Sequence, residues 1–211
     1  FFELKGDRST GEDLAILGGL GHLGGQTVMI IGQERGGEHS EGANDGKTSP
    51  AGFRKAVRLM RLAEKFEIPI ITLVDTPGPN QGAKSEQQGL GNSIASTMSI
   101  MASLNVPTIA AIIGQGGSEG ALALAIADRV LMMQNAIYTV MAPEEAANLM
   151  FDKSTTNEEA AESLRLTAAD CLELNIVDEI VGEPIGAAHE SPDAAARQLR
   201  RVILTHLTDI G

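Results

Sequence analysis

Short apolar runs alternate with longer segments of helical periodicity along most of the chain. Residues 26–33, 68–74 and 106–113 are rich in apolar and β-branched side chains, and each run has the length of a buried strand. After Pro50, apolar side chains recur at helical spacing: Phe53, Val57, Met60, Ala63 and Phe66. Because helices separate the strands, we expect parallel pairing through crossover connections and an α/β fold.

The remaining segments continue this alternation, and we expect one domain over residues 1–211. Further strands are predicted over 129–133, 137–141 and 176–181. Further helices are predicted over 86–104, from Pro143, over 155–164, over 168–174, and from a Ser191 cap towards His206. Residues 36–50 predict a mobile loop. A hairpin turn is predicted by the glycines before residue 26: Gly18, Gly19, Gly21, Gly24 and Gly25.

A cluster of glycines joins an apolar strand to an apolar helix near the middle of the sequence. The strand is expected to end near Ile113 and the helix to occupy 121–127, with four glycines between them: Gly114, Gly116, Gly117 and Gly120. Glycine lets another group approach the backbone, and a helix N-terminus points unpaired N–H groups outward. The junction is therefore predicted to bind an anion or to stabilise an oxyanion.

Composition narrows the classes of function. Of the 211 residues, 43% are hydrophobic, but there is no Trp and only one Tyr, so aromatic platforms for nucleic-acid bases are not expected. A formal charge of −12 opposes binding to a phosphate backbone, so we expect no nucleic-acid partner. Cys171 is alone, no apolar run is long enough to span a bilayer, and the first residues lack a signal-peptide layout. We expect a cytoplasmic protein without membrane insertion.

Two phosphate-binding patterns occur but fail in context. Gly19-x-Gly21-x-x-Gly24 matches a dinucleotide fingerprint, yet a strand follows it where that fingerprint requires a helix. Gly46-Lys47-Thr48 resembles the end of a phosphate loop, but the preceding glycine, Gly42, is one residue too close. No His, Cys and carboxylate grouping has metal-ligand spacing, so we expect no metal in this chain.

The glycine cluster also contains a Gly-x-Ser-x-Gly motif, with Ser118 at its centre. A serine between a strand and a helix is typical of the nucleophile elbow of hydrolases. Later residues supply an acid and then a histidine in the hydrolase order: Asp170 or Asp178, followed by His189 or His206. Serine hydrolysis through Ser118 is therefore an alternative function.

Several motifs follow one another in a fixed order along the chain. They are Phe1-Phe2-Glu3-Leu4-Lys5-Gly6-Asp7-Arg8, Pro50-x-Gly52-Phe53-Arg54-Lys55-Ala56, Asp75-Thr76-Pro77-Gly78, Gly116-Gly117-Ser118-x-Gly120-Ala121, Ala127-Asp128-Arg129-Val130-Leu131-Met132, Leu166-Thr167-Ala168-x-Asp170 and Val177-Asp178-Glu179-Ile180. This series resembles the carboxyltransferase alpha subunits of bacterial acetyl-CoA carboxylase, from about Phe1 to Arg197.

That resemblance implies a crotonase-type fold, in which β-β-α units stack into a superhelix. It implies transfer of a carboxyl group from carboxybiotin, held on a separate carrier protein, to acetyl-CoA or another short acyl-CoA, giving malonyl-CoA for fatty acid synthesis. The implied hetero-oligomer contains a beta subunit or domain with a zinc ribbon, the biotin carboxyl carrier protein and biotin carboxylase. The active site would form where the alpha and beta lobes meet.

The resemblance also assigns site residues. Backbone N–H groups of Gly82 and of Gly120–Ala121 are the expected oxyanion donors, and the turns around them are shaped by four residues: Gly78, Gly116, Gly117 and Ser118. Arg54 and Lys55 are candidates for the CoA phosphates, with a helix-surface role as the alternative.

Two features depart from the family pattern. Glu119 stands where the family usually has glycine, and the loop 36–50 is less basic than its counterpart. A carboxylate near a developing oxyanion opposes the charge that the site must stabilise, so a catalytically silent structural subunit is a further alternative. We expect Glu119 to face solvent at the helix N-terminus, where a negative charge is harmless or mildly stabilising.

Overall fold

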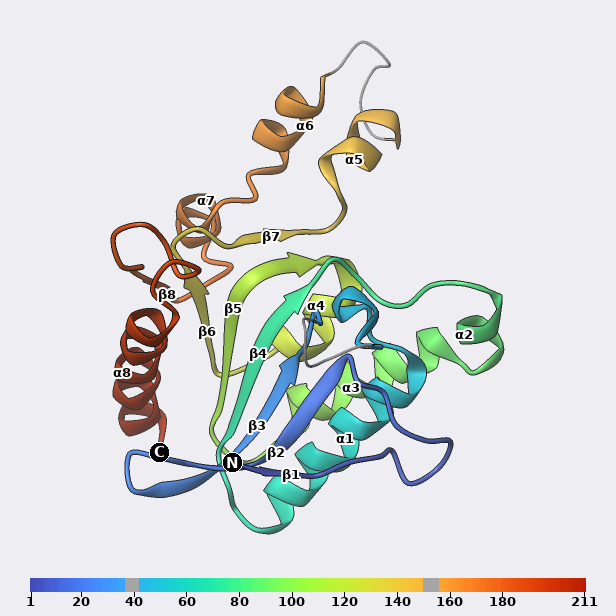
Figure 1. Ribbon diagram of the computed structural model, residues 1–211, viewed down its shortest axis with the longest axis vertical. Coiled ribbons are helices and arrows are strands. Elements are labelled where there is room, and N and C mark those ends of the chain that lie inside the picture. The colour runs from blue at the N-terminus through green and yellow to red at the C-terminus, as the bar shows by residue number, and fades with distance from the viewer. Residues whose placement is uncertain (37–41, 150–155) are drawn as a thin grey trace.

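An eight-stranded sheet runs through the middle of the molecule (Figure 1). The computed structural model describes residues 1–36, 42–149 and 156–211. In spatial order the strands are β1 (Phe2–Glu3), β2 (Ile16–Leu23), β3 (Gln26–Gln33), β4 (Ile70–Thr76), β5 (Thr108–Gly117), β6 (Arg129–Met133) and β8 (Glu179–Val181), and β7 (Ile137–Thr139) pairs with the end of β5. β1, β2 and β3 are antiparallel. The pairs from β3 to β8 are parallel, which confirms the expected crossover pairing.

Helices cover both faces of this sheet. They are α1 (Pro50–Lys65), α2 (Ala83–Gln87), α3 (Leu90–Ser103), α4 (Ser118–Ala125), α5 (Pro143–Leu149), α6 (Asn157–Leu164), α7 (Ala168–Glu173) and α8 (Pro192–Ile210). α1 contacts β2 and β3, α4 contacts β4 and β5, and α3 packs against both helices. α8 contacts β5 and β8 from the other side, while α5 and α6 pack together and project away from the sheet (Figure 1).

Aliphatic packing holds α1 on the sheet. Its apolar stripe buries Leu59, Met60 and Ala63 completely in the core of the sheet, whereas Phe53 packs with residues of α3 and α4. Each large side chain buried in this way stabilises the fold by about 1.5–3 kcal/mol. The expected stripe also included Phe66, which is wrong: Phe66 follows the helix and is 61% exposed. The helix ends at Lys65, so the periodic pattern no longer applies at position 66.

The glycine-rich segment before residue 26 is a strand for most of its length, not a turn. β2 contains Gly18, Gly19 and Gly21, and only Gly24 and Gly25 make the hairpin connection. A Cβ atom on Gly18 would collide with the Leu59 side chain, and one on Gly19 would collide with the Phe2 carbonyl. These glycines permit close packing of α1 and β1 on β2, and a sequence pattern cannot distinguish that role from a turn.

Several predicted boundaries shift for similar local reasons. The helix predicted over 86–104 is two helices, α2 and α3, separated at Gly89, which has a left-handed backbone conformation. β5 continues through the glycine cluster to Gly117 instead of ending at Ile113. Ser191 precedes α8 without making a side-chain cap hydrogen bond. In the predicted loop 36–50, residues 44–46 form a short 3₁₀ turn, whereas residues 37–41 lie outside the described part of the chain.

Candidate active site

The backbone at the start of α4 packs directly against the loop that follows β4. A Cβ atom on Gly120 would lie 2.8 Å from the Gly78 carbonyl carbon and 2.8 Å from the Pro79 nitrogen, and one on Gly117 would collide with the Pro77 carbonyl. Both neighbours are main-chain atoms, which cannot turn aside as a flexible side chain would. The glycines therefore let two backbone segments from neighbouring parallel strands meet at the carboxyl edge of the sheet.

Hydrogen bonds fix the loop after β4. The Thr76 hydroxyl donates to the Gly78 carbonyl at 2.7 Å and accepts from the Gly78 N–H at 3.1 Å. Further along, the Asn80 N–H donates to the Thr48 carbonyl at 2.9 Å. Gly82 then precedes α2 in an exposed position with φ of 131°, a conformation that L side chains rarely adopt.

A groove of about 440 Å³ opens beside the start of α4. Its lining is largely apolar and comes from α4, β7 and the segments around α6 and β8: Ser118, Glu119, Leu122, Tyr138, Thr139, Val140, Leu164, Arg165 and Ile176. Ser118 has a left-handed backbone with φ of 56°, and its hydroxyl donates a hydrogen bond to the Glu119 carboxylate. Glu119 therefore lines the groove. This differs from the expectation that its side chain faces solvent at the helix N-terminus.

Burial also shifts the pKa values of two side chains near this groove, Tyr138 and Cys171. It raises the pKa of Tyr138 to about 12, with a smaller contribution from Cys171, and it also raises the pKa of the Cys171 thiol. Both shifts favour the uncharged hydroxyl and thiol. The tyrosine ring also packs over Gly116, where an added Cβ would lie 2.7 Å from the ring.

A polar cluster lies next to the glycine junction. The Asp75 carboxylate accepts from the Gln115 N–H at 2.9 Å and contacts the Arg35 guanidinium at 3.5 Å, which in turn donates to the Gln115 side chain at 3.0 Å. A Cβ on Gly114 would lie 2.7 Å from this carboxylate. These contacts tie the ends of β4 and β5 to the segment after β3, so they support the junction from the side.

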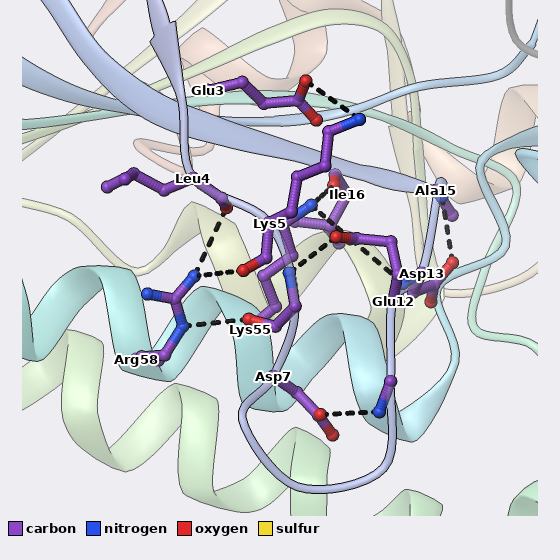
Figure 2. Close-up of polar contacts among 12 residues, drawn as sticks. Glu3, Leu4, Lys5, Asp7, Glu12, Asp13, Ala15, Ile16, Lys55 and Arg58 are labelled. Carbon is purple, nitrogen blue, oxygen red and sulfur yellow. Dashed lines mark hydrogen bonds and ion pairs between the residues drawn. The ribbon is translucent and has the colours of Figure 1, made fainter.

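Arg54 and Lys55 anchor the N-terminal segment to α1. Figure 2 shows the contacts of Lys55. The Lys55 side chain is 1% exposed, and its ammonium contacts the Glu12 carboxylate at 2.5 Å and the Ile16 carbonyl at 2.6 Å. It is therefore not on the helix surface, and a phosphate cannot reach it in this structure. Arg54 is partly exposed, but its guanidinium already contacts Asp7 at 3.0 Å and the Thr10 hydroxyl at 2.8 Å.

The acids and histidines of the alternative hydrolase do not gather around Ser118, and His189 lies near the Glu183 carboxylate, between β8 and α8. His206 contacts Glu179 at 2.9 Å on the far edge of the sheet, and Asp170 belongs to the capping box of α7. Asp178 accepts from the Val130 N–H at 2.7 Å. Among the residues that the structure describes, the hydrogen-bond partner of the Ser118 hydroxyl is a carboxylate, not an imidazole.

Two buried polar residues beneath the junction were missed by sequence reasoning. Gln33 is 6% exposed and Thr48 is fully buried, and Gln33 donates from its amide to the Gly120 carbonyl at 3.0 Å. Gln33 belongs to no motif of known chemistry, and Thr48 was considered only as part of the rejected phosphate-loop pattern Gly46-Lys47-Thr48. The one available clue was a glutamine that ends an otherwise apolar strand, at the sheet edge where sites of parallel sheets form.

Neither a metal-binding cluster nor a membrane-spanning helix occurs in the described parts of the chain. There, no group of three or more His, Cys, Asp or Glu side chains is arranged to hold a metal ion. Within the same ranges, the helices are too short or too polar to cross a membrane.

Comparison with known proteins agrees with the resemblance seen in the motifs. Residues 1–211 match the family model described as acetyl co-enzyme A carboxylase carboxyltransferase-like. The acetyl-coenzyme A carboxylase carboxyl transferase subunit alpha of Geobacter metallireducens is 46% identical, covering 100% of this chain and 67% of that protein. The same subunit of Staphylococcus epidermidis is 45% identical, covering 100% and 68%. The chain thus spans about two thirds of the length of these relatives.

Solved structures share the fold at lower identity. Transcarboxylase 12S superimposes with a TM-score of 0.77 at 22% identity, over 92% of this chain and 35% of that chain. The Pseudomonas malonate decarboxylase MdcD-MdcE hetero-dimer gives a TM-score of 0.77 at 15% identity, over 93% and 81%. These likenesses confirm the expected crotonase-type α/β fold. The family model that matches residues 1–211 and the relatives at 45–46% identity show that the chain belongs to the acetyl-CoA carboxylase carboxyltransferase family.

Proposed function

We propose that this chain forms the alpha half of a carboxyltransferase, which moves a carboxyl group from carboxybiotin on a carrier protein to acetyl-CoA. Family membership supports this class of reaction. The single structural observation that carries the proposal is the contact between Gly120 and the Gly78–Pro79 backbone. It brings the two segments that bear the proposed N–H donors together, with no side chain between them.

The reaction requires stabilised negative charge more than a side-chain base. The bond between the carboxyl carbon and the ureido nitrogen breaks, the methyl carbon of the thioester bonds to that carbon, and the methyl proton passes to the nitrogen. Negative charge develops on the ureido oxygen and on the thioester oxygen as these bonds change. Fixed backbone N–H groups stabilise such charges without reorganisation, and the loss of one donor typically costs about 10²–10³ in rate.

Within this proposal, Gly82 and the Gly120–Ala121 backbone serve the ureido oxygen, while Gly78, Gly116, Gly117 and Ser118 shape the turns. The apolar groove beside Ser118 and Glu119 suits the hydrophobic part of a bound group. Arg54 is retained as a candidate contact for CoA phosphate, whereas burial removes Lys55 from that role.

A beta subunit or domain would complete the site by supplying the donors for the thioester oxygen. The biotin carboxyl carrier protein would deliver the carboxyl group, and biotin carboxylase would load it. On this proposal the chain works in a cytoplasmic hetero-oligomer that makes malonyl-CoA.

Reconstitution tests the proposal directly. The chain is mixed with its beta partner, acetyl-CoA and carboxylated carrier, and malonyl-CoA is followed. We expect activity only from the complete mixture. Full activity of the chain without a beta partner would contradict the shared site, and an inactive complete mixture would contradict carboxyl transfer.

A serine hydrolase is the second candidate because of one observation. Ser118 has φ of 56° between a strand and a helix, as a nucleophile elbow requires, and it faces the groove. Stoichiometric labelling of Ser118 by a fluorophosphonate, with loss of hydrolysis in Ser118→Ala, would favour this candidate. The carboxyltransferase proposal predicts no labelling, because the serine only shapes the turn.

A further inference from the structure

Gln33 reaches from the end of β3 to the start of α4. Its side-chain amide is 6% exposed and donates to the Gly120 carbonyl at 3.0 Å, and it also lies 3.5 Å from the Thr48 hydroxyl. The opposite orientation of this amide would place two oxygen atoms 3.0 Å apart, so the donor assignment follows from the geometry. A single buried side chain thus links β3, the segment before α1 and α4.

The same side chain is connected to the second donor segment through Thr48. The Thr48 carbonyl accepts from the Asn80 N–H at 2.9 Å, and Asn80 lies two residues before Gly82 in the loop after β4. Thr48 is fully buried, and its hydroxyl also contacts the Gly46 carbonyl at 3.4 Å. Gln33 therefore contacts one proposed donor segment directly and the other through one intervening residue.

The amide oxygen of Gln33, Oε1, adds a cost to the burial of this side chain. This oxygen is buried and has no hydrogen-bond partner among the residues that the structure describes. A buried acceptor without a partner destabilises the folded state, and an apolar side chain of similar size would avoid that cost. The strand end therefore carries an amide where stability alone would favour methionine or leucine.

From these contacts we infer that Gln33 is a positioning residue for the paired backbone donors at Gly82 and Gly120–Ala121. The inference rests on the proposed carboxyltransferase function. The Gly120 carbonyl and the Ala121 N–H belong to one planar peptide unit, so holding the carbonyl fixes the direction of the N–H. A hydrogen bond to the carbonyl also polarises that unit and strengthens its N–H as a donor.

The variant that tests this is Gln33→Met, which keeps the size of the side chain and removes both of its donors. The matched control is Thr97→Val, because Thr97 is fully buried and bonds to the Ser93 carbonyl within α3, away from the junction. In the reconstituted complex we expect kcat of Gln33→Met to fall about tenfold or more, with KM for acetyl-CoA and for the carrier within about twofold of the wild type. We expect kcat of Thr97→Val to stay within about twofold.

Amide hydrogen exchange provides a readout that needs no activity. In Gln33→Met, the segments 78–86 and 115–125 should exchange faster than in the wild type, while the rest of the sheet is unchanged. The melting temperature should not fall below that of Thr97→Val. If Gln33→Met does not fold, Gln33→Leu replaces it, since leucine is also apolar and cannot donate to the Gly120 carbonyl.

The outcomes separate this inference from the proposed function. If the wild-type complex transfers no carboxyl group, the proposed function fails, and exchange in the two segments still decides whether Gln33 holds them. If the wild type is active and the variant matches its kcat, the positioning role is overturned. A rise in KM with unchanged kcat would also overturn it, because that pattern reports substrate binding instead of donor placement.

Discussion

The hydroxyl of Ser118 donates a hydrogen bond to the carboxylate of its neighbour Glu119, and both side chains line the groove beside α4. The bond joins adjacent residues at a point where Ser118 adopts a left-handed backbone conformation with φ of 56°. A non-glycine residue in that region carries strain, which a local hydrogen bond offsets in part. The pair is therefore a local contact at the turn from β5 into α4.

Replacing Glu119 tests whether its carboxylate affects the charge-stabilising site. In Glu119→Gly we expect carboxyl transfer within about threefold of the wild type, because the carboxylate is engaged with Ser118 and lies at a helix N-terminus, where negative charge is favourable. The measurement is malonyl-CoA formation in the reconstituted complex. An inactive wild type that Glu119→Gly restores would instead identify a silenced structural subunit.

A methyl group added at Gly120 should disrupt the meeting of the two backbone segments. The added Cβ would lie 2.8 Å from main-chain atoms of Gly78 and Pro79, so the loop must move. We expect Gly120→Ala to lower kcat about 100-fold, the scale of losing one oxyanion donor. The control is Gly91→Ala in α3, where the added Cβ meets open space. That control should be neutral or stabilise the protein by up to about 1 kcal/mol, and equal effects of the two variants would contradict the role of the contact.

Lys55 should matter for stability and not for acyl-CoA binding. In Lys55→Met, the Glu12 carboxylate and the Ile16 carbonyl lose the ammonium they share, and we expect a loss of about 2–4 kcal/mol in the free energy of unfolding. Urea titration measures this, with the exposed Lys65→Met at the end of the same helix as control, expected within about 0.5 kcal/mol. A large rise in KM for acetyl-CoA with unchanged stability would restore Lys55 as a phosphate ligand.

Asp7 should make the stability of the N-terminal segment depend on pH in the acid range. Burial by itself raises its pKa, but the N–H groups of Gly11 and Ser9, the Thr10 hydroxyl and Arg54 together hold the pKa well below its usual range. A lowered folded-state pKa stabilises the fold above the unfolded-state value near 4, and that contribution is lost as pH falls. We expect Asp7→Asn to destabilise the protein by about 2 kcal/mol at pH 7.

The difference between wild type and Asp7→Asn should then shrink progressively below about pH 4, because the unfolded wild type takes up a proton there. Urea unfolding at pH 7, 5 and 3 measures it. Asp209→Asn, on the exposed end of α8, is the control and should change stability by less than about 0.5 kcal/mol. A difference that stays constant with pH would show that the Asp7 contacts do not depend on its charge.

Tyr138 offers an optical test of packing beside the groove. It is the single tyrosine of a chain without tryptophan, so its ionisation can be followed by absorbance without interference. Burial raises its pKa to about 12, whereas an unfolded tyrosine ionises at about 10. The folded protein should therefore lose stability as pH rises from about 10 to 12, since only the unfolded state releases the proton there. Ionisation of the native protein at pH 10 would show that the ring is not buried.

Sequence patterns were sufficient for the class of fold, the parallel pairing and the family. The runs at 26–33 and 129–133 coincide with β3 and β6, and the helix from Pro50 begins where it was predicted. These features depend on local backbone preference and on the period of apolar side chains, and both can be read from the sequence. The glycine cluster between an apolar strand and an apolar helix also located the junction, because glycines are typical of close backbone contacts.

Tertiary structure alone decided how side chains distant in sequence meet. Gly18 and Gly19 lie in a strand because α1 and β1 pack onto it, and Lys55 is buried because the segment around Glu12 folds over α1. Gln33 and Gly120 are 87 residues apart and become neighbours because β3, β4 and β5 lie side by side. The sequence does not indicate which residue a buried polar side chain will bond to, because strand order and not local spacing determines that partner.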